Sequence, residues 1–431
     1  MIWPLINIEA IALCAYFFRD AFAGAMRYYL DRAGLGVAWF LPDLLAFVCV
    51  AAFVYRYGVH RRSRLAIATT AVIFFSTLIG YFFLGTIEGL LSSIKMMVPV
   101  FVGFLFAERY VGDYRKTLHF VHFLLYASML GILLSSIVEL PWVGYTFAAI
   151  TGERQATTVW WQGETVRLSG FAADSTMAAF FVMISFVLTS INRSTIWALV
   201  VGPVALAAIQ LTTNKTYLLV LGVYILALVM VRSVRRETGF RLLRLMAVGS
   251  YACILVPVML MILLGGVDLE RIDPLLFSMQ DRINNSWQKP FVFMAEIFPI
   301  GYVTGCGVGC FNYPQDLFAP SKLAYIVPVD NFYVGTYLMF GPIFLVFVAL
   351  VIRAAMDVVD VYKLTAMIVV NLYTITILSY GPASGLIMIS LSFSAVFASR
   401  AMRRSVGAEA VFQAPPRREV ALPAHALPSP A

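Results

Sequence analysis

Residues 216–231 read TYLLVLGVYILALVMV. The run contains no charged residue, and as an α-helix it extends about 24 Å at 1.5 Å per residue, close to the ~30 Å hydrocarbon core of a bilayer. Polar and basic residues flank it, with TTNK before it and RSVRR after it. The stretch therefore predicts a membrane-spanning helix, because a single helix satisfies its own backbone hydrogen bonds in lipid.

The same pattern recurs along the whole chain of 431 residues. Hydrophobic residues make up 61% and charged residues 13%, with a mean hydropathy of +0.86, which excludes a soluble globular domain and a disordered chain. We predict an all-α, polytopic integral membrane protein with about 10–12 transmembrane helices. The predicted spans are 2–18, 37–55, 65–85, 89–107, 118–138, 175–191, 194–211, 216–231, 245–265, 332–352, 364–380 and 384–398.

The basic residues predict the orientation. The chain has 31 Lys and Arg, and those outside the spans divide roughly two to one between alternate sets of connecting segments. Cytoplasmic loops carry the excess of Lys and Arg, so both termini are expected in the cytoplasm. The net charge of +8 then reflects topology, and we expect no nucleic-acid partner.

We divide the chain into a polytopic membrane domain, residues 1–400, and a tail, residues 401–431. The tail is rich in Pro and Ala, which predicts a disordered cytoplasmic segment. The first apolar run lacks a basic n-region and a cleavage site, and we expect it to be a retained span. Two long outward loops are predicted at about 139–174 and 266–331.

These outward loops carry cations that oppose the topology rule. The first holds Arg167 in VRLSGF, residues 166–171, and the second holds Arg271, Arg282, Lys289 and Lys322. An anionic, membrane-bound substrate handled at the outer face would account for them.

Arg167 and Lys215 are the first candidate ligands. Arg167 precedes a predicted span, and its planar guanidinium matches phosphate oxygens, while Gly170 lets the backbone approach a ligand. Lys215 stands at the tip of the outward turn TTNKT, residues 212–216, where it can act as a point charge. A structural arginine and a solvated turn lysine are the alternatives.

Asp330 and Lys95 are the next candidates. Asp330 ends the long loop beside a span and can act as a general base, although capping of the next helix by Asp330 or Asn331 is the alternative. Lys95 lies inside the predicted span 89–107, where a cation lines a cavity or pairs, and it is a further candidate for a lipid-linked phosphate. Glu88 is its nearest candidate partner in the sequence.

The long loop also contains GCGVGC, residues 305–310. Gly305, Gly307 and Gly309 do not precede Lys-Ser/Thr, so a nucleotide-binding loop is not indicated. Cys306 and Cys310 are candidates for a disulfide, which the sequence leaves open. With four histidines in the chain, and His119 and His122 one turn apart, we expect neither a metal site nor a cofactor.

In this order, the features resemble the O-antigen polymerase and O-antigen ligase superfamily over approximately residues 90–355. Its loose motifs are matched by Arg167 with Gly170 and Phe171, Lys215, Arg282 with Trp287, Gly305 with Gly307, Gly309 and Phe311, and Asp330 with Asn331, Tyr333 and Gly341. Lys215 stands where such proteins usually have Arg. Asp330 stands where the ligases have His, which favours a polymerase.

The resemblance implies a glycosyltransferase of the bacterial inner membrane that joins polyprenyl-pyrophosphate-linked repeat units at the periplasmic face, in exopolysaccharide, capsule or O-antigen biosynthesis. It implies that Arg167, Lys215 and Arg282 hold the pyrophosphate, that Asp330 accepts a proton, and that no divalent metal takes part. A chain-length regulator is a further candidate partner. An O-antigen ligase acting on lipid A core, a flippase or transporter of lipid-linked sugars, and a non-catalytic membrane subunit remain alternatives.

Overall fold

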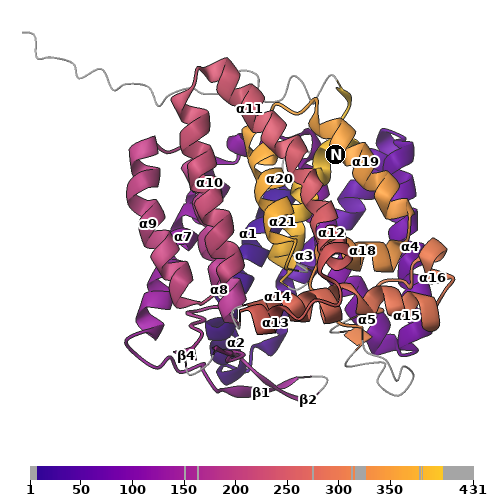
Figure 1. Cartoon of the computed structure of the whole chain (residues 1–431), viewed down its shortest axis with the longest axis horizontal. Coiled ribbons are helices and arrows are strands. Elements are labelled where there is room, and N and C mark those ends of the chain that lie inside the picture. The colour runs from indigo at the N-terminus through magenta and orange to yellow at the C-terminus, as the bar shows by residue number, and fades with distance from the viewer. Residues whose placement is uncertain are drawn as a thin grey trace, which may run out of the picture.

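The computed structural model describes residues 7–149, 152–162, 165–273, 276–311, 314–315, 327–377, 380 and 382–400. Within these ranges the chain is overwhelmingly helical, with two small strand pairs, so the predicted all-α class is confirmed (Figure 1). The predicted disordered tail, residues 401–431, and Lys322 lie outside the described residues.

Six helices in the described part of the chain are long and apolar enough to cross a membrane. The protein is therefore a polytopic membrane protein. Three of the six are single helices: α4 (Arg64–Leu84, apolar over Arg64–Phe82), α7 (Arg115–Ser135) and α10 (Lys215–Ser233). The other three combine shorter elements. Gly36–His60 contains α3 (Leu41–Phe53), Ile87–Glu108 contains α5 (Ile87–Met97) and α6 (Pro99–Phe104), and Arg236–Leu264 contains α11 (Arg236–Gly249) and α12 (Val256–Leu264).

Helix α1 and five shorter apolar helices complete the bundle. They are α1 (Ile8–Ala21), α8 (Ser175–Ser190), α9 (Thr195–Leu211), α19 (Ile343–Ala355), α20 (Val361–Tyr373) and α21 (Ala383–Phe393, continued by a 3₁₀ turn to Phe397). Helix α8 is the most enclosed of the six, because every residue in it except Thr176 is buried. Apart from the run 332–352, the helices overlap the predicted runs, whereas the predicted total of 10–12 transmembrane helices stays a prediction.

The predicted span 332–352 is broken in the structure. Helix α18 (Phe332–Phe340) ends at Gly341, which has a φ of 66°, and Pro342 precedes α19. A left-handed glycine followed by proline ends a helix, because the first turns the chain and the second cannot donate to the preceding turn. This apolar run therefore forms two helices. Hydropathy alone did not distinguish one continuous span from two shorter apolar helices.

The remaining elements gather at one end of the bundle, which we call the loop face (lower part of Figure 1). Two antiparallel pairs lie there: β1 (Thr146–Ala149) with β2 (Gly152–Gln155), and β3 (Trp161–Gln162) with β4 (Thr165–Val166). The other elements are α2 (Ala23–Arg32), α13 (Leu269–Ile272), α14 (Phe277–Asp281), a π-helical turn at Arg282–Trp287, α15 (Lys289–Glu296) and α16 (Gly301–Thr304). We call the other end, where α7 and α9 begin and α10 finishes, the opposite face.

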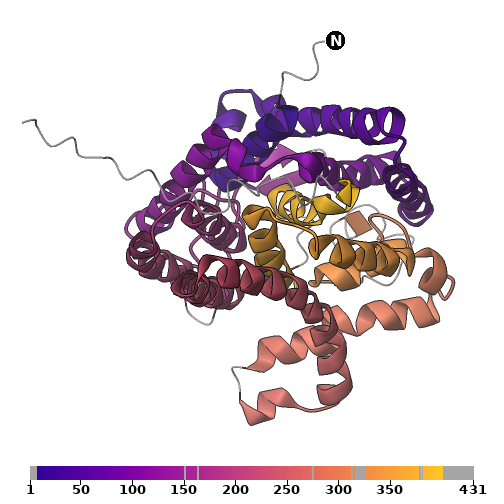
Figure 2. The same cartoon turned by 90° about the horizontal axis from the view of Figure 1, so that it is seen from above.

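The long predicted loop is thus largely helical. Seen from above, the chain between about residues 250 and 300 extends out from one side of the bundle (Figure 2). Its apolar residues pack among themselves, with Leu269, Ile283 and Trp287 forming a small core. Trp287 is 2% exposed, so it belongs to this core and is not presented at the surface.

Candidate functional site

Arg282 and Asp330 form an ion pair at the loop face. Arg282 opens the π-helical turn, and its Nε donates to Asp330 Oδ2 at 2.9 Å. Their side chains are 29% and 33% exposed. The neighbouring Asn331, not Asp330, caps α18, because its side chain accepts from the backbone N–H of Val334. Asp330 is consequently not engaged in capping α18.

The second oxygen of Asp330 has different surroundings. Oδ1 is buried and has no hydrogen-bond partner. The indole N–H of Trp287 lies close enough to Asp330 to stabilise the charged form of its carboxylate. The two groups do not form a hydrogen bond of normal geometry, and Trp287 Nε1 is likewise buried without a partner. Burial raises the pKa of the Asp330 carboxyl above its ordinary range, against the opposing effect of Arg282. A raised pKa and an unpaired oxygen are properties of a general base.

Arg167 approaches the same region from the first loop. It follows β4, its backbone N–H bonds to Trp160 O at 2.9 Å, and its Nε donates to Thr212 O at 3.3 Å. Burial lowers the pKa of Arg167, Asp174 opposes this, and Arg282 adds to the lowering. Arg167 and Arg282 are therefore near enough to repel one another. No described carboxylate lies within ion-pair distance of Arg167.

Lys215 stands on the turn that Arg167 contacts. It is the first residue of α10, is exposed, and has no ion-pair partner among the described residues. The turn is held by Thr216, whose hydroxyl lies 2.6 Å from that of Thr376. Thr213 has a φ of 56°, unusual for a β-branched residue, and a buried hydroxyl without a partner. Such strain is frequent at ligand sites, and the sequence held no signal for it.

The structure thus pairs Arg282 with Asp330, brings Arg167 close enough for its charge to act on that of Arg282, and places Lys215 on the turn that Arg167 contacts. Lys95 has different neighbours. Its Nζ lies 3.7 Å from Asp43 Oδ2 and 4.7 Å from the centre of the Phe40 ring.

Asp43 also accepts from Arg19 at 3.1 Å and from the Tyr16 hydroxyl at 2.9 Å. Arg19 further pairs with Asp20 at 2.9 Å. This second cluster contains equal numbers of cations and carboxylates, so its charges compensate one another. Asp43, not the expected Glu88, is the partner of Lys95.

The four candidate glycines lie where backbones meet. Gly170 has a φ of 59°, and a Cβ there would come within 2.9 Å of the α7 backbone at Gly131. In the 305–309 loop all three glycines have positive φ values, and a Cβ on Gly307 would lie 2.0 Å from Gly80 N in α4. The loop packs against helix backbones, so these glycines shape the chain and touch no candidate catalytic group.

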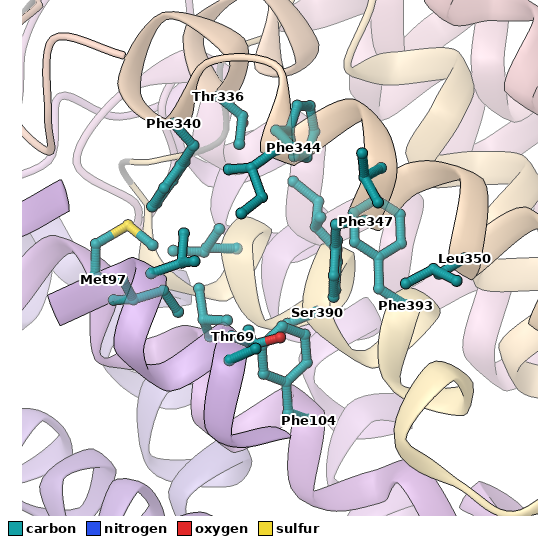
Figure 3. A pocket seen from close by; sticks show the side chains of 18 of the residues that line it. Thr69, Met97, Phe104, Thr336, Phe340, Phe344, Phe347, Leu350, Ser390 and Phe393 are labelled. Atoms are coloured by element: carbon teal, nitrogen blue, oxygen red, sulfur yellow. The ribbon is translucent and has the colours of Figure 1, made fainter. Parts of the chain in front are cut away.

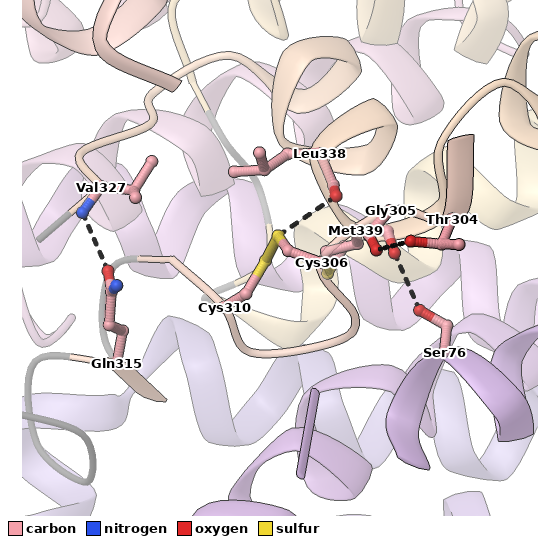
Figure 4. The surroundings of a disulfide bond; sticks show 9 residues. All are labelled: Ser76, Thr304, Gly305, Cys306, Cys310, Gln315, Val327, Leu338 and Met339. Atoms are coloured by element: carbon pink, nitrogen blue, oxygen red, sulfur yellow. Dashed lines mark hydrogen bonds between the residues drawn. A yellow bond between two sulfur atoms is a disulfide. The ribbon is translucent and has the colours of Figure 1, made fainter. Parts of the chain in front are cut away.

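Cys306 and Cys310 form a disulfide within this loop (Figure 4). Both residues are fully buried. The loop is further tied to α18, since Cys306 N bonds to Leu338 O at 2.8 Å and Gly307 N to Met339 O at 3.1 Å. Ser76 of α4 donates to Met339 O at 3.0 Å, so loop, α4 and α18 are joined.

An apolar cavity of ≈ 260 Å³ lies among α4, α6, α18, α19 and α21 (Figure 3). Its walls are mostly aromatic and aliphatic, including Phe104, Phe340, Phe344 and Phe347. Phe332, two residues after Asp330, also lines it. One wall of the cavity is therefore adjacent to Asp330 in the sequence. Hydropathy gave no indication that this cavity exists.

Within the described ranges, no group of three or more His, Cys, Asp or Glu is arranged to hold a metal ion. Comparison with protein-family models, curated proteins and solved structures returned no match.

Proposed function

We propose that this protein is a polysaccharide polymerase: a glycosyltransferase that joins polyprenyl-pyrophosphate-linked repeat units at the periplasmic face of a bacterial inner membrane. The loop face is then periplasmic and both termini are cytoplasmic. The polymer would be an exopolysaccharide, a capsule or an O-antigen. Cationic side chains take the part that a divalent metal plays in other sugar transfers.

The observation that carries the proposal is the Arg282–Asp330 pair at 2.9 Å, with a second arginine, Arg167, close enough for the two positive charges to act on one another. Two guanidinium groups that repel one another are costly unless an anion joins them, and Arg is the residue best suited to bind phosphate oxygens by paired hydrogen bonds. Lys215 adds a third, exposed charge on the turn that Arg167 contacts. A pyrophosphate, with its several negative charges, suits such a group.

The chemistry can be divided between the two oxygens of Asp330. Oδ2 holds Arg282, whereas Oδ1 has no partner and would accept the proton of the attacking sugar hydroxyl. That hydroxyl oxygen bonds to the anomeric carbon of the donor as the bond from this carbon to the phosphate oxygen breaks. The polyprenyl pyrophosphate departs with the electron pair. Arg167, Arg282 and Lys215 stabilise its charge, each donor contributing about 2–4 kcal/mol.

The apolar cavity supports a substrate that arrives from the bilayer. Its lining comes mostly from apolar helices of the bundle, and one lining residue, Phe332, follows Asp330 by two positions in the chain. The long loop, with α13, α14 and α15, extends beside this region and would cover the reacting groups.

Two other functions share parts of this argument. A ligase would use the same cations and donor but transfer the glycan to lipid A core. A flippase or transporter would need charges near the middle of the membrane, and Lys95, which lies within the helix Ile87–Glu108 and pairs with Asp43, is the feature that favours it.

The deciding experiment is glycan length in cells carrying Arg167→Ala. We expect the protein to be present in membranes while polymer is lost and single repeat units accumulate on lipid or reach the surface. Arg271→Ala is the matched control, because Arg271 is on the same face but 87% exposed and paired with Asp268. Unchanged polymer length in Arg167→Ala would refute the mechanism. Long chains that form on lipid but never reach lipid A would identify a ligase.

A further inference from the structure

A second polar cavity lies at the opposite face, at the far end of the bundle from Asp330. It has a volume of ≈ 180 Å³ and lies between the start of α7, the end of α8 and the chain leading into α9. One buried water needs about 15 Å³ by a comparable measure, so the cavity has room for a polyatomic group. Its lining residues are Leu118, His119, His122, Leu188, Thr189, Asn192 and Arg193.

The side chains of this cavity offer hydrogen-bond donors. Arg193 Nη2 lies 3.3 Å from His122 Nε2. Because an arginine can only donate, Nε2 accepts and the proton of a neutral His122 resides on Nδ1. That Nδ1 is buried and has no partner. Thr189 is 7% exposed, and its hydroxyl is likewise buried without a partner. Both orphaned donors belong to residues that line one cavity, which indicates a site that accepts a ligand oxygen.

The charge around the cavity is positive. The titratable groups that act on His122 are Arg193 and His119. No described carboxylate pairs with Arg193. The carbonyls at the end of α8 are occupied by Arg232, whose Nη2 donates to Ser190 O at 2.7 Å. The seventeen-residue helix α9 begins at Thr195, after the N-cap residue Ser194, and its N-terminus adds partial positive charge near Arg193.

The position of the cavity identifies the source of the anion. It lies at the end of two membrane helices, where lipid headgroups are found. Trp197 packs against Phe186 and His122, and tryptophan favours this interfacial depth. We propose that His122, Thr189 and Arg193 form a binding site for a phosphate oxyanion, supplied by the headgroup of an anionic phospholipid in the leaflet at the opposite face. The proposal is independent of the polymerase assignment.

The test uses the full-length protein in nanodiscs of phosphatidylcholine, with and without phosphatidylglycerol. Thr189→Val removes one hydroxyl at nearly constant volume, and Arg193→Gln removes the charge. Arg235→Gln, an exposed residue outside the cavity on the same face, is the control. We measure the retained phosphatidylglycerol by native mass spectrometry and the melting temperature by intrinsic fluorescence.

We expect phosphatidylglycerol to raise the melting temperature of the unmodified protein and of Arg235→Gln. Arg193→Gln should weaken lipid retention about tenfold or more, since a hydrogen bond to a charged group is lost, and Thr189→Val by a smaller factor. Equal retention in all four proteins would overturn the proposal. If millimolar inorganic phosphate in pure phosphatidylcholine discs gives the same thermal shift, the ligand is soluble phosphate and the lipid source is refuted.

Discussion

The Arg282–Asp330 pair yields the sharpest prediction, because its two members can be separated by a double-mutant cycle. At 2.9 Å the charges attract by ~6 kcal/mol for an effective dielectric constant of 20, before solvent screening. Fully exposed pairs retain about 1 kcal/mol or less, but both of these side chains are about two thirds buried, so the pair should retain somewhat more. We therefore expect Arg282→Gln and Asp330→Asn to couple by about 1–2 kcal/mol in the free energy of unfolding in detergent.

The same cycle applied to activity tests whether the pair works as a unit. With a lipid-linked repeat unit as substrate, Asp330→Asn should lower the rate of glycosidic bond formation about 10²–10⁴-fold, the usual contribution of a general base. Arg282→Gln should lower it about 10²–10³-fold. Because the two residues serve one transition state, the double variant should be no slower than the worse single variant by more than a few-fold.

An ion pair on the same face provides the matched control. Arg271 and Asp268 are 2.7 Å apart but more exposed, so Arg271→Gln with Asp268→Asn should couple by less than about 0.5 kcal/mol and leave activity unchanged. If the rate losses of Arg282→Gln and Asp330→Asn multiply in full, the two residues act independently. The shared role argued from their contact is then wrong.

Three further predictions follow from the described contacts. Asp330 must be ionised to accept a proton, so the rate should fall as the pH drops through the raised pKa of Asp330. Arg282→Gln should move this acidic limb of the pH–rate profile to higher pH, because the guanidinium holds the pKa of Asp330 down. Asp330→Asn should abolish the acidic limb. Gly307→Ala should destabilise the fold by about 2–4 kcal/mol, from its φ of 88° and the overlap of a Cβ with α4, seen as a lower melting temperature. Arg19→Met should lower the free energy of unfolding by about 3–5 kcal/mol, because it leaves the buried carboxylates Asp20 and Asp43 without their cation. Lys95 is 41% exposed, so Lys95→Met should lower it by less than about 1 kcal/mol. Equal losses of the two variants in denaturant titrations would contradict this ranking.

Much of the fold was predictable, because a bilayer imposes one dominant constraint. Long apolar runs must become helices, and those runs coincide with the helices observed. The exception is the run 332–352, where Gly341 takes a left-handed conformation and Pro342 follows. Hydropathy does not distinguish a span from two shorter apolar helices, since both have the same composition.

The candidate site was only partly predictable. Arg167 and Lys215 stood out because their local sequence placed a cation against the topology rule. The Arg282–Asp330 pair did not, because 48 positions separate its members and no local pattern reports such a contact. The choice of helix cap was open between Asp330 and Asn331, and only the direction of the Asn331 side chain decides it.

The distribution of Lys and Arg is interpreted differently once the carboxylate partner of each cation is known. By sequence, the cations of the loop face are alike. In the structure, Arg19 and Arg271 are compensated by carboxylates, and Arg282 shares Asp330, which keeps a second, unpaired oxygen. Arg167 and Lys215 have no carboxylate partner among the described residues, and they occupy neighbouring positions. Positive charge without a partner is what an anionic substrate requires, so the uncompensated cations, not the total number of cations, indicate where the proposed pyrophosphate would bind.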